Sequence, residues 1–141
     1  MEDKKPHFAI QRIFVKDLSM ECPNSPEIFK DWNPELAVDL KTQHRHLEED
    51  FWEASMVIKA TVKSSDKVAF ICEVEQAGIF TLSNVPEGQT EQLLETIGME
   101  AIYPFAREVI ADIVVKAGFH QLLLAPINFD AYSQEKKKQA S

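Results

Sequence analysis

Two histidines two residues apart, His44 and His46, could ligate a metal ion if a third donor such as His120 came near them. In a strand, both imidazoles would lie on one face of a sheet. Polar residues dominate the surrounding segment, 43–48, and favour a solvated loop over a metal site. We therefore expect neither a metal nor another cofactor in this protein.

Cys72 could act as a nucleophile if the fold placed it beside His120. However, Cys72 alternates with Phe70 and Val74 in a segment typical of a strand, which places the thiol on the apolar face. A thiol among apolar side chains behaves as a small hydrophobic residue. Cys22 lies far away in the sequence, without a CxxC spacing. We therefore predict two reduced thiols and an inert Cys72.

Two carboxylates, Glu73 and Glu75, share one face of the same segment and could form an acid pair. Acid–base catalysis needs one carboxyl group desolvated, so that the two pKa values separate. An exposed acidic patch explains the pair more simply. The chain has four glycines and contains none of the GxxxxGK[ST], GxGxxG, GxSxG or HExxH patterns. We expect no nucleotide hydrolysis and no enzymatic activity.

The composition is that of one soluble domain. The 141 residues are 45% apolar and 27% charged, as in globular proteins. A net charge of -8 disfavours nucleic acid as a partner. The longest apolar run, 122–127, is far shorter than the ~20 residues that span a bilayer. The charged segment 1–7 lacks the apolar core of a signal peptide, so we expect a cytoplasmic protein that does not insert into membranes.

Four successive segments are typical of strands. Residues 36–41, 52–63 and 68–75 alternate apolar and polar side chains, and the polar turn 64–67 joins the last two as a hairpin. Residues 8–20 form a first strand, rich in Phe, Ile and Val. One face of this strand is predicted to carry Phe8, Ile10, Phe14, Leu18 and Met20. No helical crossover separates the four strands, which predicts an antiparallel meander.

Helical periodicity begins after the strands. A short turn over 90–97 is predicted to end at Gly98. The long helix 105–117 carries apolar residues over an arc of about 180°, wider than the ~100° that packing on one sheet requires. Its excess apolar surface predicts self-association through the helices. Asn128 can cap a short final helix that runs to Tyr132.

Together these elements predict an α+β fold in a single domain, residues 1–141. A four-stranded antiparallel meander is followed by a long helix and a short C-terminal helix, and the helices pack on one face of the sheet. Residues 1–7 and 133–141 are predicted to be flexible tails.

The connection 21–35 contains three prolines and two large aromatic residues, Phe29 and Trp32. The two rings either tuck onto the core, as aromatic residues of connections usually do, or line a groove suited to extended apolar segments. The residues alone leave both alternatives open.

Five segments of the chain share their pattern with one known family. They are Ile10–Asp17 (IQRIFVKD), Asp31–Glu35 (DWNPE), Phe70–Phe80 (FICEVEQAGIF), Tyr103–Glu108 (YPFARE) and Leu124–Asp130 (LAPINFD). The match runs in register from about residue 8 to residue 132, nearly the whole chain. On these segments the chain resembles SecB, the family of bacterial protein-export chaperones.

The resemblance implies a homotetramer, a dimer of dimers with helices sandwiched between two eight-stranded sheets. It also implies a protein without ATPase activity that holds newly made precursor proteins unfolded in the cytoplasm and passes them to SecA, the translocase motor. Long apolar grooves would bind these clients.

The resemblance also assigns site residues. It places the client-binding groove at Phe29, Trp32, Leu36, Val38 and Leu40. It places a SecA-binding acidic face at Asp17, Glu21, Ile71 and Glu73. It places tetramer contacts at Cys72, Val74 and Gln76. The alternation of the strand that holds residues 71–76 agrees, because it separates the last two sets onto opposite faces.

Two departures from the family pattern bear on function. The chain ends in the basic segment 133–138, where the family continues with a longer apolar helix and an acidic tail. The family pattern therefore leaves open whether this region forms a groove lid or contacts SecA. Ala77 replaces the first glycine of a Gly-Gly pair, which reduces backbone freedom but leaves the expected function unchanged.

A second hypothesis is a small oligomeric α+β protein that binds or acts on a hydrophobic small ligand in the same groove. Such a site would contain a convergent polar cluster, and the sequence shows no candidate for one.

Overall fold

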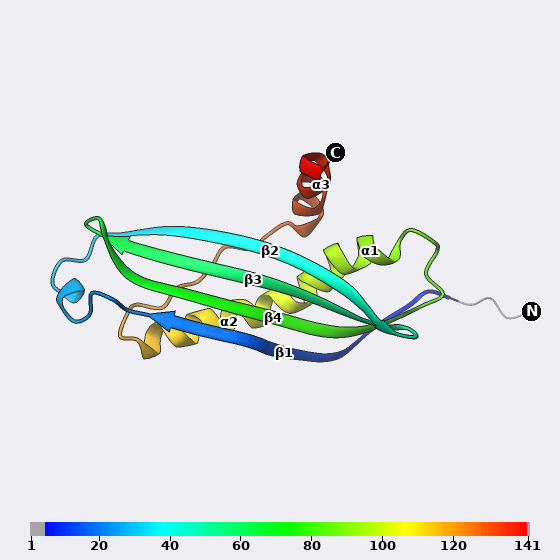
Figure 1. Ribbon diagram of the computed structural model, residues 1–141, viewed down its shortest axis with the longest axis horizontal. Helices are drawn as coiled ribbons and strands as arrows, with labels where there is room; N and C mark the ends of the chain where they lie inside the picture. Colours follow the sequence, from blue (N-terminus) through cyan, green and yellow to red (C-terminus); the bar gives the residue numbers. More distant parts are fainter. Residues whose placement is uncertain (1–4, 141) are drawn as a thin grey trace, which may run out of the picture.

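The computed structural model describes residues 5–140 as a four-stranded sheet with helices behind it (Figure 1). The strands are β1 (His7–Glu21), β2 (Pro34–Glu48), β3 (Phe51–Ser64) and β4 (Lys67–Ser83). The helical segments are a 3-10 turn (Glu27–Phe29), α1 (Thr90–Leu93), a π turn (Leu94–Gly98), α2 (Met99–Lys116) and α3 (Phe129–Ala140). The predicted α+β class is confirmed, as are the antiparallel sheet, the long helix and the short C-terminal helix.

The strands are arranged in the order β1-β4-β3-β2, and all neighbours are antiparallel. A meander would place β1 beside β2, so that part of the prediction is wrong. The long connection after β1 leads instead to the far edge of the sheet, from which two hairpins return the chain to the side of β1. This is the Greek-key arrangement, in which the first strand pairs with the last. Both β1 and β2 are therefore edge strands.

The two hairpins have tight turns. Ser65 and Asp66 have φ values of 51° and 66°, the left-handed conformation that a two-residue turn between β3 and β4 requires. The predicted hairpin is thus confirmed. Glu49, with φ of 49°, occupies the turn between β2 and β3.

His44 and His46 belong to β2, because this strand continues to Glu48. They pair across the sheet with Ala54 and Trp52 of β3. The prediction of a solvated loop is therefore wrong. Pairing with a well-packed neighbouring strand outweighs the polar composition of the segment, since strand preference depends strongly on context.

Two bulges change the face on which the side chains of β1 lie. The register with β4 shifts after Ile10 and again after Val15. As a result Phe14 pairs with Ala77 on the outer face of the sheet, whereas Ile13 packs against the core. The single face predicted for β1 is wrong at Phe14, because one extra residue in a strand reverses the side chains that follow.

Gly98 does not end a helix. The chain is helical without a break from Thr90 to Lys116, and Gly98 itself has helical φ and ψ of -60° and -47°. A Cβ at Gly98 would lie 3.8 Å from the Cβ of Ala54, so the missing side chain brings the helix close to β3. Packing against the sheet outweighs the low helix propensity of one glycine, and the predicted interruption is wrong.

The core lies between the inner face of the sheet and α2. Its largest fully buried side chains include Met56, Ile58, Phe70, Phe80, Ile102 and Ile110. Gly78 allows α2 to cross β4 closely, because a Cβ there would approach Cγ2 of Ile102 to 2.9 Å. Ala77 points to the opposite face, so its departure from the family's glycine pair does not disturb this crossing.

Asn128 caps α3. Its side-chain oxygen accepts a hydrogen bond of 3.1 Å from the backbone N–H of Ala131, which confirms the predicted N-cap. The helix then continues to Ala140, beyond Tyr132 where the sequence predicted it to end. Its basic second half forms helical turns and projects past the edge of β2 (Figure 1).

Two side chains of α3 fasten it to the free edge of β2. The Tyr132 hydroxyl donates to the carbonyl of Leu40 at 3.2 Å, and the Lys136 ammonium donates to the carbonyl of Thr42 at 2.9 Å. Backbone groups of an edge strand otherwise face solvent and can pair with another chain. α3 therefore covers part of the β2 edge.

Candidate functional site

Phe119, which follows α2, gathers the aromatic rings of the connection between β1 and β2. Its ring centroid lies 4.9 Å from that of Phe70 on β4, 5.0 Å from that of Phe29 and 5.4 Å from that of Trp32. Phe119 is 7% exposed, whereas Phe29 and Trp32 remain 43% and 37% exposed. Each of the two alternatives left open by the sequence holds in part, because both rings rest on the core and also face solvent.

Gly118 positions this cluster. The N–H of Phe119 donates to the carbonyl of Val114 at 3.2 Å, and the N–H of Gly118 donates to that of Val115 at 3.0 Å, which is the Schellman ending of a helix. Gly118 has φ of 95°, and a Cβ there would lie 3.2 Å from Cζ of Phe29. The predicted helix stop is thus confirmed, and it also makes room for the Phe29 ring.

Trp32 separates two hollows at this end of the sheet. The larger, of about 220 Å³, has apolar walls that include Trp32, Leu36, Val62, Phe70 and Leu122. The smaller, of about 120 Å³, lies between Phe29, Trp32, Phe119 and the loop after α2. Concave surfaces lined by aromatic and aliphatic side chains bind apolar segments.

Three further groove residues continue from these hollows along β2. Leu36, Val38 and Leu40 alternate on the strand, so their side chains lie on the same face. Leu36 and Val38 are 47% and 43% exposed, whereas Leu40 packs against the core beside Tyr132. The structure brings the five predicted groove residues into one strip, called the groove below, with Phe29 and Trp32 at one end and Leu40 at the other.

Sequence reasoning missed Phe119, His120 and Leu122, which complete the wall opposite β2. Gly118 was a signal for them, because an aromatic residue directly after a helix stop contacts whatever lies beneath the helix end. The sequence could not show that this place is occupied by the connection between β1 and β2.

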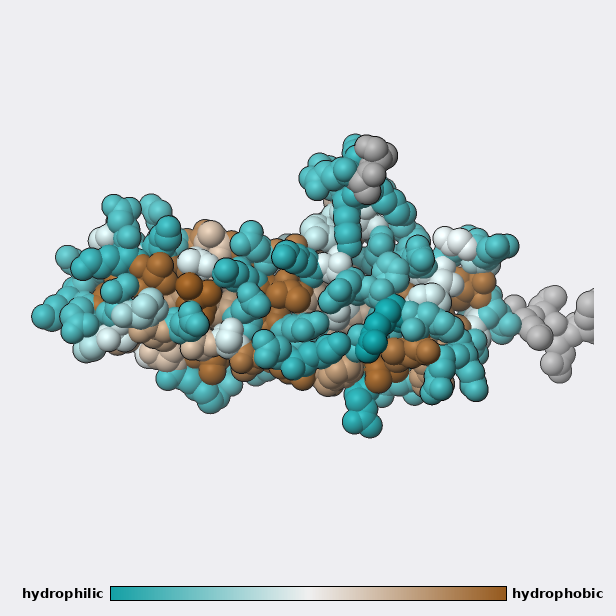
Figure 2. Space-filling view, viewed as in Figure 1, coloured by the Kyte–Doolittle hydropathy of each residue, from teal (hydrophilic) through white to brown (hydrophobic). Residues whose placement is uncertain are grey.

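The predicted acidic residues lie together on the outer face of β1 and β4. The register pairs Asp17 with Glu75 and Glu21 with Ile71, and it places Glu73 opposite Ser19. Figure 2 shows this face, where hydrophilic and hydrophobic side chains are interspersed. In the part of the chain that the structure describes, no ion pair neutralises these carboxylates. We call Asp17, Glu21, Ile71 and Glu73 the acidic face, and Glu75 lies beside them, opposite Asp17.

A different carboxylate on the same side of the sheet is neutralised. Glu53 is 7% exposed, and its Oε1 lies 3.3 Å from the Lys16 ammonium and 2.9 Å from Nε of Arg45. Lys16 and Arg45 come from the two edge strands, so Glu53 joins opposite edges of the sheet. This contact occupies two cations that would otherwise offset the acidic face.

The three predicted tetramer residues face the helices. Cys72 and Val74 are fully buried and Gln76 is 2% exposed, all within one chain. Oε1 of Gln76 is buried without a hydrogen-bond partner among the described residues. These side chains therefore do not form an open surface, and any influence on assembly would pass through the packing of α2.

The thiols are poor nucleophiles. Burial, with a smaller contribution from nearby Cys22, raises the pKa of Cys72 to about 11. Burial also raises the pKa of Cys22. Both thiols are free, and the raised pKa values favour the protonated form at neutral pH, in keeping with the apolar surroundings expected for Cys72.

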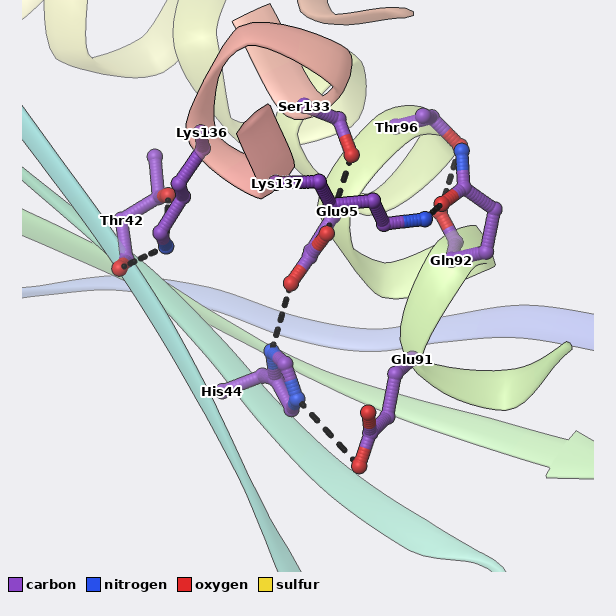
Figure 3. A network of polar contacts seen from close by, with 9 residues as sticks. All are labelled: Thr42, His44, Glu91, Gln92, Glu95, Thr96, Ser133, Lys136 and Lys137. Atoms are coloured by element: carbon purple, nitrogen blue, oxygen red, sulfur yellow. Dashed lines mark hydrogen bonds and ion pairs between the residues drawn. The ribbon is translucent and has the colours of Figure 1, made fainter. Parts of the chain in front are cut away.

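No helix among residues 5–140 is long and apolar enough to cross a bilayer. Nor do the described residues contain a cluster of three His, Cys, Asp or Glu side chains arranged to hold a metal. The ring of His44 instead lies between two glutamates (Figure 3), and that of His46 contacts the Trp52 ring at a tilt, with centroids 4.6 Å apart.

Comparison with known proteins matches the whole chain. A family model described as preprotein translocase subunit SecB covers residues 1–140. The protein-export protein SecB of Hydrogenovibrio crunogenus is 46% identical over 141 residues, 99% of this chain and 95% of that protein. The protein of the same name from Psychrobacter arcticus is 44% identical over 138 residues, 97% of this chain and 93% of that protein.

One solved structure shares the fold. The Mycobacterium tuberculosis SecB-like chaperone Rv1957, in complex with a ChAD peptide from the Rv1956 HigA1 antitoxin, aligns with a TM-score of 0.73 at 15% identity. The alignment covers 85% of this chain and 90% of that chain.

Proposed function

The chain belongs to the SecB family, and we propose that it is a holdase that keeps newly made precursor proteins unfolded in the cytoplasm and delivers them to SecA. It is a protein-export chaperone that acts without ATP and without catalysis. The observation that carries this function is the groove, in which half-exposed apolar side chains form an open strip. An open strip suits extended polypeptides better than a small molecule, which needs an enclosed pocket.

Binding alone explains how such a protein delays folding. Full burial of one large apolar side chain stabilises a complex by ~1.5 to 3 kcal/mol, and four groove residues keep more than a third of their surface free for a client. When the concentration of free chaperone is ~100 times the Kd for the unfolded client, binding opposes client folding by about 2.7 kcal/mol. Slow-folding precursors expose apolar segments for longer, so they are captured more often.

Delivery to SecA would use the acidic face. This face lies on the side of the sheet opposite the groove, so client and SecA can bind at the same time. Its carboxylates lack neutralising partners among the described residues and would attract a basic surface.

We further propose the homotetramer, a dimer of dimers with helices between two eight-stranded sheets. Among the described residues, no side chain donates to a carbonyl of β1, whereas α3 covers part of the β2 edge. β1 also exposes Ile10, Val15 and Leu18 by 51%, 42% and 40%. These observations favour β1 as the edge at which two sheets join.

Contacts between dimers would involve α2, on which Phe105 is 51% exposed. Phe105→Asp is expected to weaken association of dimers at least ~10-fold, because a charge would replace an apolar side chain that the proposed contact between dimers would bury. Sedimentation velocity on a dilution series would measure the change. Leu123→Asp, in the loop after α2 and 67% exposed, is the matched control and should leave the tetramer intact. If the tetramers of both variants were equally stable, the contact between dimers would not lie at Phe105 of α2.

The proposed function is tested by diluting a slow-folding secretory precursor from denaturant, without nucleotide, in the presence of excess protein. We expect refolding to slow strongly and to resume when SecA is added. Light scattering, circular dichroism and SecA-dependent release would follow the outcome. Refolding at an unchanged rate, with the protein itself folded, would reject the holdase and favour a small hydrophobic ligand in the groove.

A further inference from the structure

The connection between β1 and β2, which carries Trp32, meets the sheet where β3 turns into β4 (Figure 1). Ser64 is the last residue of β3 and is fully buried. Its hydroxyl donates a hydrogen bond of 2.9 Å to the carbonyl of Asp31 and accepts one of 2.8 Å from the backbone N–H of Asn33. One buried side chain thus binds the backbone on both sides of Trp32.

Pro34 explains why a side chain makes these contacts. β2 begins at Pro34, which lies opposite Ser64 in the register of β2 and β3. Proline has no N–H to donate to a strand ladder and is found at the first position of strands, where regular pairing stops. The backbone groups before Pro34 therefore find their partners outside the ladder, and the hydroxyl of Ser64 supplies two of them.

The rest of the connection is held in a different way. Residues 22–30 form hydrogen bonds among themselves around the 3-10 turn, and Ile28 is buried in the core. The side chain of Asn24 donates to the carbonyl of Val68 on β4 at 2.8 Å. In the part of the chain that the structure describes, the side-chain hydrogen bonds that tie 31–33 to the sheet are the two of Ser64.

The ring of Trp32 has little packing of its own to fix it. Its centroid lies 5.4 Å from that of Phe119, and the two hollows of the groove open beside it. The residue is 37% exposed. A ring with open space next to it keeps one orientation only if its backbone is fixed, so the attachment of 31–33 decides where the indole lies.

We propose that Ser64 is a positioning residue that holds the Trp32 indole as a fixed wall between the two hollows. Its importance for clients rests on the proposed function. A client segment then binds against a wall that is already in place, and the complex does not lose affinity to the ordering of a loop. Without the hydroxyl, the freed backbone groups of Asp31 and Asn33 would bond to water, because both residues are exposed. The loop would move while the sheet persisted.

Tryptophan fluorescence of the full chain tests this wall without any client. The chain has two tryptophans, so Trp52→Phe leaves Trp32 as the single emitter. In this background we expect Ser64→Ala to raise the rate constant of acrylamide quenching about two- to threefold, because local opening of the loop exposes the indole. Time-resolved anisotropy should show a larger amplitude of nanosecond motion for the same reason.

Ser55→Ala is the matched control for the fluorescence measurement. Ser55 is another buried serine of β3, 2% exposed, and it pairs with Gln43 and Ala77 rather than with the connection. Its replacement should leave the quenching and the anisotropy of Trp32 unchanged. If Ser64→Ala gave the same quenching as Ser55→Ala, the proposal would be overturned.

A double-mutant cycle with a client separates positioning from a general loss of stability. Ser64→Ala should raise the Kd of a labelled, unfolded precursor fragment about three- to tenfold, since two hydrogen bonds that fix a contact residue are lost. In the Trp32→Ala background the same change should raise Kd by less than about twofold, because the wall that Ser64 positions is then absent. Equal losses in both backgrounds would show that Ser64 does not act through Trp32 and would also overturn the proposal.

Hydrogen exchange of the wild type keeps the proposal testable even if Ser64→Ala does not fold. The amide of Asn33 bonds to a buried hydroxyl, so we expect it to exchange at least about tenfold more slowly than in an unstructured peptide. Exchange at the unstructured rate would overturn the attachment. If the wild type bound no unfolded precursor at all, the proposed function would be rejected instead, and the quenching and exchange results would still decide how Trp32 is held.

Discussion

Trp32→Ala is expected to weaken capture of an unfolded client about 30-fold or more while the fold and the oligomer persist. Trp32 forms a wall of both hollows in the groove, and its indole is 37% exposed. Truncation of a central aromatic anchor raises the free energy of a complex by ~2 kcal/mol or more, and ~1.4 kcal/mol is a factor of ten in Kd. Phe119 stays packed on Phe70, so the core beneath the groove survives.

Fluorescence anisotropy with a labelled, permanently unfolded precursor fragment would measure this Kd. Leu47→Ala is the matched control, because Leu47 is also 37% exposed and lies on β2 outside the groove. We expect its Kd to stay within about twofold of the wild type. Leu40→Ala should show a smaller loss than Trp32→Ala, since Leu40 is already partly covered. If the wild type and Trp32→Ala bound the precursor fragment with equal affinity, the groove would not be the client-binding site.

The alternation of apolar and polar residues predicted the strands well, but it did not predict which strands pair, in particular that β1 pairs with β4. Alternation in 52–63 and 68–75, with the polar turn between them, was sufficient to identify the β3–β4 hairpin. Both the alternating pattern and the turn depend on residues that are close together in the sequence. The position of β1 depends on how the connection after it crosses the sheet. Only contacts far apart in sequence, such as Trp32 with Phe119, decide that path.

The candidate sites were predicted to different degrees for the same reason. Glu21, Ile71 and Glu73 come together because the β1–β4 register places odd-numbered residues of both strands on one face. Alternation had placed Asp17 and Glu21 on the face opposite Leu18 and Met20, and this prediction is correct because the two bulges of β1 cancel each other beyond Val15. His44 was misinterpreted because its segment is polar. Its partners Glu91 and Glu95 come from a helical turn that the sequence placed without showing what it would contact.

Glu73→Lys is expected to weaken SecA binding about 30- to 100-fold and to leave client capture unchanged. The substitution reverses a charge at the centre of the acidic face and adds a cation opposite Lys59 of β3. Like charges across an interface disfavour association by several kcal/mol, and exposed charges are screened by salt. Surface plasmon resonance at about 0.05 M and 0.5 M salt should therefore show a loss that shrinks at high salt.

Glu87→Lys is the matched control for this variant, because Glu87 is exposed in the loop before α1 and makes the same change in net charge. If SecA affinity falls in Glu73→Lys but not in Glu87→Lys, the position of the charge is responsible rather than the net charge of the protein. Cys72 and Val74, the neighbours of Glu73 on β4, are fully buried, so a disturbed strand would lower the unfolding temperature. If Glu73→Lys changed neither the unfolding temperature nor the SecA affinity, the sheet would be intact and the reversed charge would have no effect on binding. That result would reject the acidic face as the SecA-binding surface.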